Sequence, residues 1–204
     1  KKARLRWLAP QTLHGNYLLA SLNDRDSTVF DLYKVFVDGS TPQLVTQNPG
    51  NVSNWFASPD GKVRLAVTSD SVQESILYRP DGKGPFKQVT VTDYQTQIQP
   101  LGFVKGSASH IYALSNHGRD KLALVEYNAA EGREERVLYS NEEVDLESAG
   151  YSDNLQTMVF SQYTVDKPEK HFFDVQFRRN FEKLSAQFKG QSIDILDTDT
   201  SLNR

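Results

Sequence analysis

The feature that most constrains this chain is a repeat of 47 residues. Four short apolar runs, LLAS, LAVT, YALS and VFSQ, begin at Leu18, Leu65, Tyr112 and Val159, so each starts 47 residues after the one before it. Self-similarity at one fixed period indicates stacked structural units, in which each unit covers the apolar face of the next. The repeat therefore has to be explained before any single motif.

The same succession of segments surrounds each run. An apolar or aromatic segment and a turn come before it; a third segment, a second turn and a more polar fourth segment come after it. The first segments are residues 5–8, 54–56, 101–104 and 149–151, and the turns after them are 14–16, 59–62, 105–107 and 153–154. Third segments follow at 32–37, 76–78 and 122–127, and fourth segments at 43–46, 87–91 and 135–139. Gly, Asn and Asp close tight hairpins, so each unit predicts four short antiparallel strands.

Regularly spaced short strands are typical of sandwiches, barrels and propellers. The period favours a propeller, because a four-stranded blade takes about 40–50 residues. We expect an all-β fold: a partial β-propeller of about four four-stranded antiparallel blades with one short helical insertion. The second strand should pack between blades, and the charged fourth strand should form the outer edge. The predicted single incomplete domain, 1–204, has units at about 1–50, 51–97, 98–146 and 147–176, a helix at about 176–189 and a further blade starting at 191–204.

The fourth unit departs from the pattern after Gln162. A polar turn at 166–170 leads to a strand-like segment at 171–175. An apolar stripe then recurs at steps of four, three and four, at Phe177, Phe181, Leu184 and Phe188, and Gly190 follows it. This spacing predicts a helix, which we expect across the rim of the propeller. The alternative is a surface for another domain or subunit. We expect the natural protein to continue beyond Arg204, since an open set of blades leaves apolar faces uncovered.

Composition excludes several kinds of site and partner. The chain has no cysteine, which rules out disulfides, thiolate zinc sites and cysteine nucleophiles. Its net charge of −3 gives no reason to expect a nucleic-acid partner. No run approaches the roughly 20 apolar residues of a membrane helix, so we expect no membrane partner. The absence of cysteine fits both a reducing cytosol and an exported bacterial domain, which leaves the compartment open.

Candidate catalytic and metal-binding patterns are weak. The G-x-S-x-G elbow of serine hydrolases is absent: residues 190–194 begin like one but end in aspartate, and residues 106–110 lack the final glycine. The four histidines, His14, His110, His117 and His171, lack the H-E-x-x-H spacing of a zinc site and are interpreted as turn or surface residues. We expect no catalytic, metal-binding or cofactor-binding residue, and no cofactor.

Two further patterns each have an ordinary interpretation. Asp197, Asp199, Ser201 and Asn203 alternate like the oxygen ligands of a calcium loop, but the sixth-position glycine is missing and a hairpin turn is favoured. Asn51-Val52-Ser53 fits the N-glycosylation triplet, which matters only in a secreted eukaryotic protein.

The turn Ser58-Pro59-Asp60-Gly61, within WFASPDGK, resembles the SPDG turn of propellers in the prolyl oligopeptidase family of serine peptidases and in related periplasmic propellers. The stretch 151–204 resembles bacterial members of that family, of the dipeptidyl- or acylaminoacyl-peptidase kind. There a blade ending in an apolar-Asp pair is followed by a short helix, a strand and a Ser/Asp-rich turn. Phe173-Asp174, the helix through Phe188 and residues 190–204 follow that order.

The resemblance implies a function for the whole protein. In such peptidases an N-terminal propeller covers a C-terminal α/β-hydrolase domain and restricts the access of large substrates. The chain would then be a noncatalytic segment whose partner is that domain of the same protein, with peptide substrates met indirectly, in the bacterial cytoplasm or periplasm. The alternative is a non-enzymatic propeller that serves as a protein-binding platform. In either case we expect the open blade faces to allow self-association.

Overall fold

The strands expected from the repeat form four separate antiparallel sheets. The computed structural model describes residues 3–8, 15–152, 155–191 and 193–195. The first sheet holds β1 (Leu5–Trp7), β2 (Tyr17–Leu22), β3 (Asp31–Phe36) and β4 (Gln43–Thr46); the second holds β5 (Val52–Ala57), β6 (Val63–Ser69), β7 (Glu74–Tyr78) and β8 (Lys87–Thr92). The third holds β9 (Ile98–Phe103), β10 (His110–Ser115), β11 (Ala123–Asn128) and β12 (Arg133–Tyr139); the fourth holds β13 (Ser148–Ser152), β14 (Thr157–Thr164) and β15 (Pro168–Phe172).

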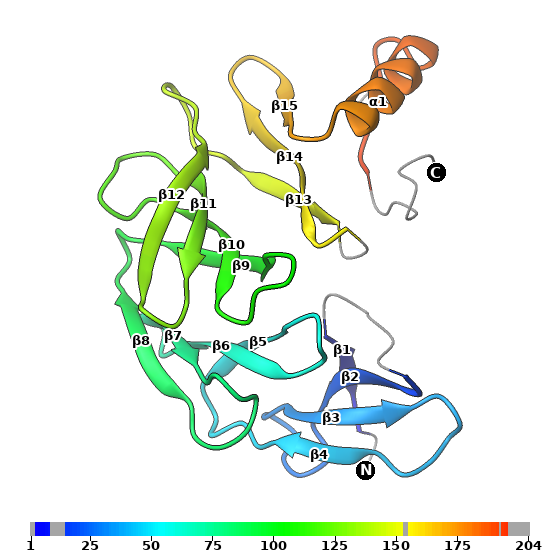
Figure 1. The fold of residues 1–204 in the computed structure, drawn as a ribbon, viewed down its shortest axis with the longest axis vertical. Helices are drawn as coiled ribbons and strands as arrows, with labels where there is room; N and C mark the ends of the chain where they lie inside the picture. The colour runs from blue at the N-terminus through cyan, green and yellow to red at the C-terminus, as the bar shows by residue number, and fades with distance from the viewer. Residues whose placement is uncertain (1–2, 9–14, 153–154, 192, 196–204) are drawn as a thin grey trace. The chain divides into compact units, whose positions relative to one another are not determined.

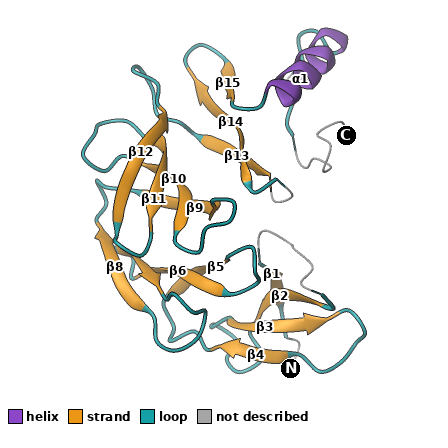
Figure 2. Ribbon diagram, in the orientation of Figure 1, coloured by secondary structure: helices purple, strands orange, loops and turns teal. Residues whose placement is uncertain are grey.

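Each sheet is an up-and-down meander in which strands adjacent in sequence are adjacent in space (Figures 1 and 2). The described residues add one helix, α1 (Val175–Gln187). The predicted all-β fold class is confirmed, and the sheets are consistent with blades of a partial propeller. Three sheets have four strands, whereas the fourth has three among the described residues.

The 47-residue repeat appears in the structure as a buried second strand. The runs noted above lie in β2, β6, β10 and β14. Their third positions, Ala20, Val67, Leu114 and Ser161, are all buried. Each of these strands also has a strand on both sides, so its backbone groups are paired within the sheet. The fourth strands β4, β8 and β12 form sheet edges and are largely exposed, as predicted.

The SPDG turn between β5 and β6 shows how local polar groups fix a hairpin. Gly61 adopts φ 76°, which glycine accepts without steric cost. The Ser58 hydroxyl donates to Asp60 Oδ1 at 2.7 Å, and the guanidinium of Arg64 binds both oxygens of Asp60. These bonds hold the pKa of Asp60 well below its usual range, mainly through Arg64. The turn is therefore structural.

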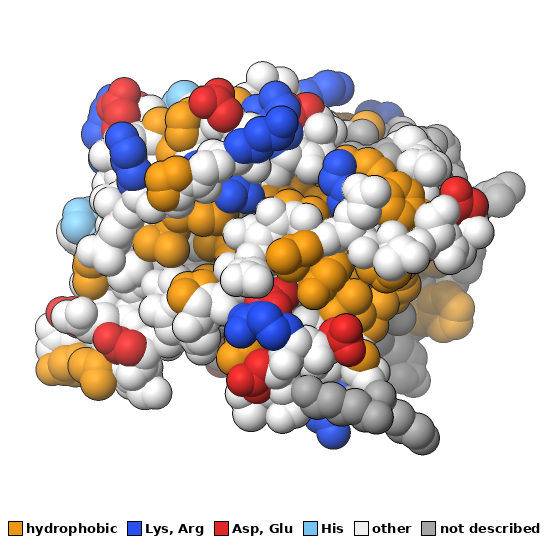
Figure 3. All heavy atoms as spheres, turned by 90° about the horizontal axis from the view of Figure 1, so that it is seen from below, with side chains coloured by type: hydrophobic (Ala, Val, Ile, Leu, Met, Phe, Trp, Pro, Cys, Tyr) orange, Lys and Arg blue, Asp and Glu red, His pale blue; other side chains and the backbone are white. Residues whose placement is uncertain are grey.

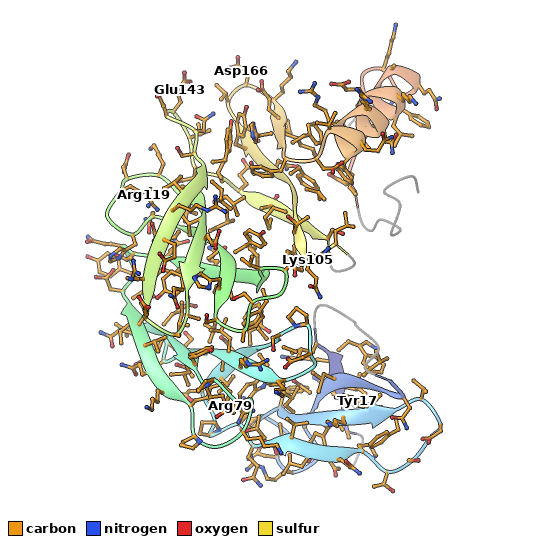
Figure 4. All side chains as sticks on the ribbon, in the orientation of Figure 1. Tyr17, Arg79, Lys105, Arg119, Glu143 and Asp166 are labelled. Carbon is orange, nitrogen blue, oxygen red and sulfur yellow. The ribbon has the colours of Figure 1, made fainter. Side chains whose placement is uncertain are left out.

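The chain divides into two compact units. The first comprises residues 1–95 and 129–133, and the second comprises 96–128 and 134–204. In the first unit a buried cluster joins the two sheets, and its members are Leu8, Leu19, Leu32, Trp55, Val63 and Ala66. Next to it, Arg79, labelled in Figure 4, is buried with its guanidinium 4.2 Å from the ring centre of Phe86. The expectation of a single domain over 1–204 stays a prediction.

The second unit is built in the same way from the third and fourth sheets. Its buried cluster comprises Leu114, Leu124, Leu146 and Met158. Tyr151 of β13 donates its hydroxyl to the carbonyl of Phe103 at 2.7 Å and lies over Gly102 of β9. A side chain at Gly102 would come within 2.8 Å of the Tyr151 ring, so glycine allows this close packing.

The helix α1 covers aromatic side chains of the fourth sheet. Asp174 caps it by accepting a hydrogen bond from the Phe177 N–H at 2.7 Å. Phe177 stacks on Phe160, with ring centres 5.9 Å apart, and also contacts Phe172. The end of the predicted stripe is open, because Leu184 and Phe188 are 44% and 54% exposed. Among the described residues, no helix is long and apolar enough to span a membrane.

One detail of the fourth unit differs from the sequence expectation. The polar turn was expected at 166–170 and the strand at 171–175, whereas β15 runs from Pro168 to Phe172. Proline is tolerated there because it is the first residue of an edge strand. Asp174 ends the strand region because its side chain caps the helix. Of the expected further blade at 191–204, residues 192 and 196–204 lie outside the described residues, and residues 193–195 form no strand.

Candidate functional site

The first unit contains a cavity of about 400 Å³ beside β1 and β5. Side chains of both strands line it, together with the loops that precede β3 and β5. Its lining residues include Arg6, Trp7, Phe30, Asn48, Asn54 and Trp55. Its volume lies toward the small end of the range of ligand pockets.

The loop between β4 and β5 is held by one buried side chain. Asn48 donates from Nδ2 to the carbonyl of Val52 at 2.8 Å, and its Oδ1 accepts the N–H groups of Gly50 and Val52. The Asn48 N–H donates to Asp31 Oδ1 at 2.8 Å. Because all these groups are satisfied locally, this wall of the cavity is fixed without a ligand.

An ion pair also holds the loop between β4 and β5. Arg25 binds Asp31 through two bonds, from Nε at 2.7 Å and from Nη2 at 2.8 Å, and also donates to the carbonyl of Asn48. The Asp31 side chain is almost fully buried. The hydrogen bonds from Arg25 lower the pKa of Asp31, against the opposing effect of burial. Asp31 is therefore a charged structural group rather than a proton donor at neutral pH.

The open side of the cavity is aromatic and cationic. The chain has two tryptophans, and both line the cavity: Trp7 is 45% exposed and Trp55 is buried. The guanidinium carbon of Arg6 lies 3.9 Å from the ring centre of Phe30. On the face shown in Figure 3, basic and acidic side chains are intermixed, so charge is local rather than gathered in one broad patch.

The described lining of the cavity offers hydrogen-bond donors and aromatic rings rather than side chains that titrate near neutral pH. Its described lining includes no histidine, aspartate, glutamate or lysine. General acid–base catalysis at neutral pH needs a group that titrates there, which an arginine does not supply. The arrangement can hold an anionic or aromatic group through Arg6 and the tryptophans.

The strongest resemblance to a catalytic arrangement lies around His110 in the second unit. Its Nδ1 lies 3.2 Å from Ser107 Oγ and 3.3 Å from Ser109 Oγ, and its Nε2 lies 3.9 Å from Glu135 Oε1. Ser107 Oγ also accepts the N–H groups of Ser109 and His110. Glu135 Oε1 accepts from Asn128 Nδ2 at 3.1 Å. The serine therefore closes the turn before β10, whereas His110 is the first residue of that strand and partly buried, rather than the turn or surface residue that the sequence predicts.

The remaining histidines are spread over the chain. His117 is exposed in the turn after β10, where its N–H donates to Ser115 Oγ, and His14 lies outside the described residues. His171 in β15 stacks on Tyr139 with ring centres 3.8 Å apart, and burial lowers its pKa. In the same cluster, a hydrogen bond with Tyr139 raises the pKa of Tyr163 to about 12. A neutral imidazole packed among aromatic rings is a structural element here.

The other candidate patterns take these positions. Asn51 is exposed just before β5, and the Ser53 hydroxyl of its triplet donates to the carbonyl of Val67 at 3.1 Å. Asp197 to Asn203 and Ser192 lie outside the described residues. Within residues 3–8, 15–152, 155–191 and 193–195, no group of three His, Asp or Glu side chains is placed to hold a metal ion.

The repeat and the sequence motifs do not identify the residues that line the cavity. A signal was available, since Trp7 and Trp55 lie in the first strands of the first and second units, and the basic residue Arg6 precedes Trp7. Their meeting in one cavity depends on how the first two sheets pack, which the repeat alone does not specify.

Comparison with known proteins adds one relative. No protein-family model matches the chain. A protein named dipeptidyl aminopeptidase BIII, from Pseudoxanthomonas mexicana, is 25% identical to it over 177 residues, which are 85% of this chain and 25% of the relative. The chain thus spans about a quarter of the length of the curated relative it matches. This similarity supports, at the level of the family, the resemblance carried by the SPDG turn and by residues 151–204.

Proposed function

We propose that the chain is a noncatalytic propeller segment of a serine peptidase of the prolyl oligopeptidase type. Its role is to restrict the access of peptides to a C-terminal α/β-hydrolase domain of the same protein. The observation that carries the proposal is the similarity to a dipeptidyl aminopeptidase over 85% of the chain. The meander sheets repeating every 47 residues support it, because they are the architecture expected of such a segment.

The described side chains agree with a supporting role. Ser107 and His110, the pair nearest to a nucleophile and base, are engaged in a turn. The carboxylates of Asp31 and Asp60 are bound by arginines. The hydrolytic step would therefore be carried out by residues of the other domain, while this chain shapes the route that peptides take.

A direct test is to translate the gene downstream of Arg204. The proposal expects a G-x-S-x-G elbow followed by an aspartate and then a histidine, the order of an α/β-hydrolase. A reading frame that ends after a few more blades without such an elbow would refute it.

The second candidate is a non-enzymatic binding platform, which the preformed cavity beside β1 favours. In that case the gene would lack the elbow, and affinity purification from native lysate would recover a stable partner whose release follows substitution of the cavity residues. Recovery of no partner, with a hydrolase domain in the gene, would reject the platform.

A further inference from the structure

The cavity beside β1 contains one positive charge, that of Arg6, among its described lining residues. Arg6 is the one charged side chain among its described lining residues, and it forms no ion pair or hydrogen bond with the part of the chain that the structure describes. Its contact with the face of Phe30 fixes the guanidinium without using its N–H donors. A planar fork of free donors is the group that binds a carboxylate with two hydrogen bonds.

Asn54 supplies a further donor to the same cavity. Its Oδ1 accepts the N–H of Trp55 at 3.0 Å, which leaves the Nδ2 amino group to donate. Asn54 is exposed, and Nδ2 has no partner among the described residues. Arg6 and Asn54 belong to different sheets of the first unit, so their convergence is a product of the fold.

Among the described residues, the backbone of β1 has a strand partner along one side only. β1 is the end strand of its sheet and pairs with β2 alone. The Leu8 N–H donates to the carbonyl of Leu19, and the carbonyl of Arg4 accepts from the Asn23 N–H. The backbone groups of Arg4, Arg6 and Leu8 therefore point toward β2. By the alternation of an antiparallel pair, Leu5 and Trp7 direct theirs outward. An extended peptide can add to such an edge through main-chain hydrogen bonds.

The side chains at those outward positions are also apolar and accessible. Leu5 is 40% exposed and Trp7 is 45% exposed, and Trp7 lines the cavity. A chain lying on the edge would cover both while placing alternate side chains toward the cavity. Apolar contact, main-chain pairing and a cationic pocket therefore occur together at one strand.

We propose that β1 and its cavity bind an extended acidic peptide segment. Its backbone pairs with the free edge at Leu5 and Trp7, and an aspartate or glutamate carboxylate binds Arg6 with help from Asn54. The charge selects an acidic ligand, and the open edge selects a polypeptide over a small carboxylate.

The two tryptophans make the test direct, because both line the cavity and no other tryptophan contributes to the emission. The probe is a blocked hexapeptide of alternating leucine and glutamate, compared with its glutamine counterpart, added to the 204-residue chain at low ionic strength. Binding of the glutamate peptide should shift the tryptophan emission to shorter wavelength. Its dissociation constant should be about tenfold lower than that of the glutamine peptide, as for one charge-assisted pair.

Variants identify the residue that carries the preference. Arg6→Gln should remove the tenfold difference between the peptides, and Arg6→Glu should favour a lysine counterpart instead. The matched control Lys87→Gln removes an exposed cation of β8, outside the cavity, and should leave the preference intact. Trp7→Phe should abolish most of the emission change. Circular dichroism spectra matching that of the parent chain establish that each variant is folded.

Four results would overturn the proposal: no emission change with either peptide, equal affinity for both, equal losses in Arg6→Gln and Lys87→Gln, or full competition by acetate at the concentration of the peptide. The outcome is separable from that of the proposed function. If the peptide binds but the gene encodes no downstream hydrolase, the peptidase proposal is rejected and the peptide-binding site stands. If a downstream hydrolase is present but the peptide does not bind, the peptide-binding site is rejected and the peptidase proposal stands.

Discussion

The attachment of α1 to the fourth sheet is centred on Phe177, the buried residue of the helix. Phe177 is 5% exposed and lies between Phe160, at 5.9 Å, and Phe172, at 6.1 Å. Phe181 adds a second contact, with its ring centre 5.2 Å from that of Phe172, whereas Leu184 and Phe188 are about half exposed. Phe177→Ala should therefore weaken the attachment of the helix to the sheet while leaving the Asp174 cap in place.

The expected loss of stability follows from the burial of the Phe177 ring. Truncating a buried phenylalanine costs about 3 kcal/mol at the lower end of measured values, which suits a site at the edge of the second unit. A free 13-residue helix is marginal in water, so the loss should appear as local unfolding of α1. About 3 kcal/mol corresponds to roughly a hundredfold loss of protection from hydrogen exchange.

The assay is hydrogen exchange followed by mass spectrometry over peptides that cover 175–187. Phe188→Ala is the matched control, since it removes the same side chain from a position that is 54% exposed, and it should change protection by less than about threefold. Equal protection in the two variants would refute the reasoning, as would a loss spread evenly over β13 to β15.

Two further predictions concern the first unit. Asp31→Asn should lower the melting temperature at pH 7, whereas the same change at the exposed neighbour Asp24 should not. Because Arg25 lowers the pKa of Asp31, the charged carboxylate stabilises the fold above the unfolded pKa of about 4, and this stabilisation is lost as pH falls through the folded pKa. A difference in melting temperature between parent and variant that persists unchanged at pH 2 would contradict this. Gly132→Ala and Gly106→Ala both place a side chain at positive φ, but only at Gly132 would the added carbon meet a backbone oxygen, that of Val89. Gly132→Ala should therefore lower the melting temperature more than Gly106→Ala. Equal decreases in melting temperature would contradict the steric argument.

Much of the fold could be predicted because each strand and turn of the repeat is formed by a short, continuous segment. The runs at Leu18, Leu65, Tyr112 and Val159 became second strands, and Gly61 and its neighbours closed the expected turn. Spacing of the aromatic stripe from Phe177 was sufficient to predict α1. The start of β15 was misplaced, because Pro168 and the charged residues after it have the composition of a turn, and only their position on a sheet edge makes a strand possible.

The candidate site could not be predicted in the same way. Arg6 and Asn54 lie 48 residues apart and line the same cavity only because the first two sheets share one buried cluster. The support from Asp31 and Asn48 depends on loop hydrogen bonds that leave no periodic trace in the sequence. Conversely, Ser107 and His110 are near neighbours in sequence, and the structure shows that their proximity serves a turn.

The central claim, that this chain is the noncatalytic part of a serine peptidase, is tested most directly by labelling with a fluorophosphonate that reacts with activated serines. We predict that the 204-residue chain stays unlabelled, while the complete product of its gene is labelled at a serine after Arg204. Labelling of the 204-residue chain itself, abolished by Ser107→Ala, would contradict the claim.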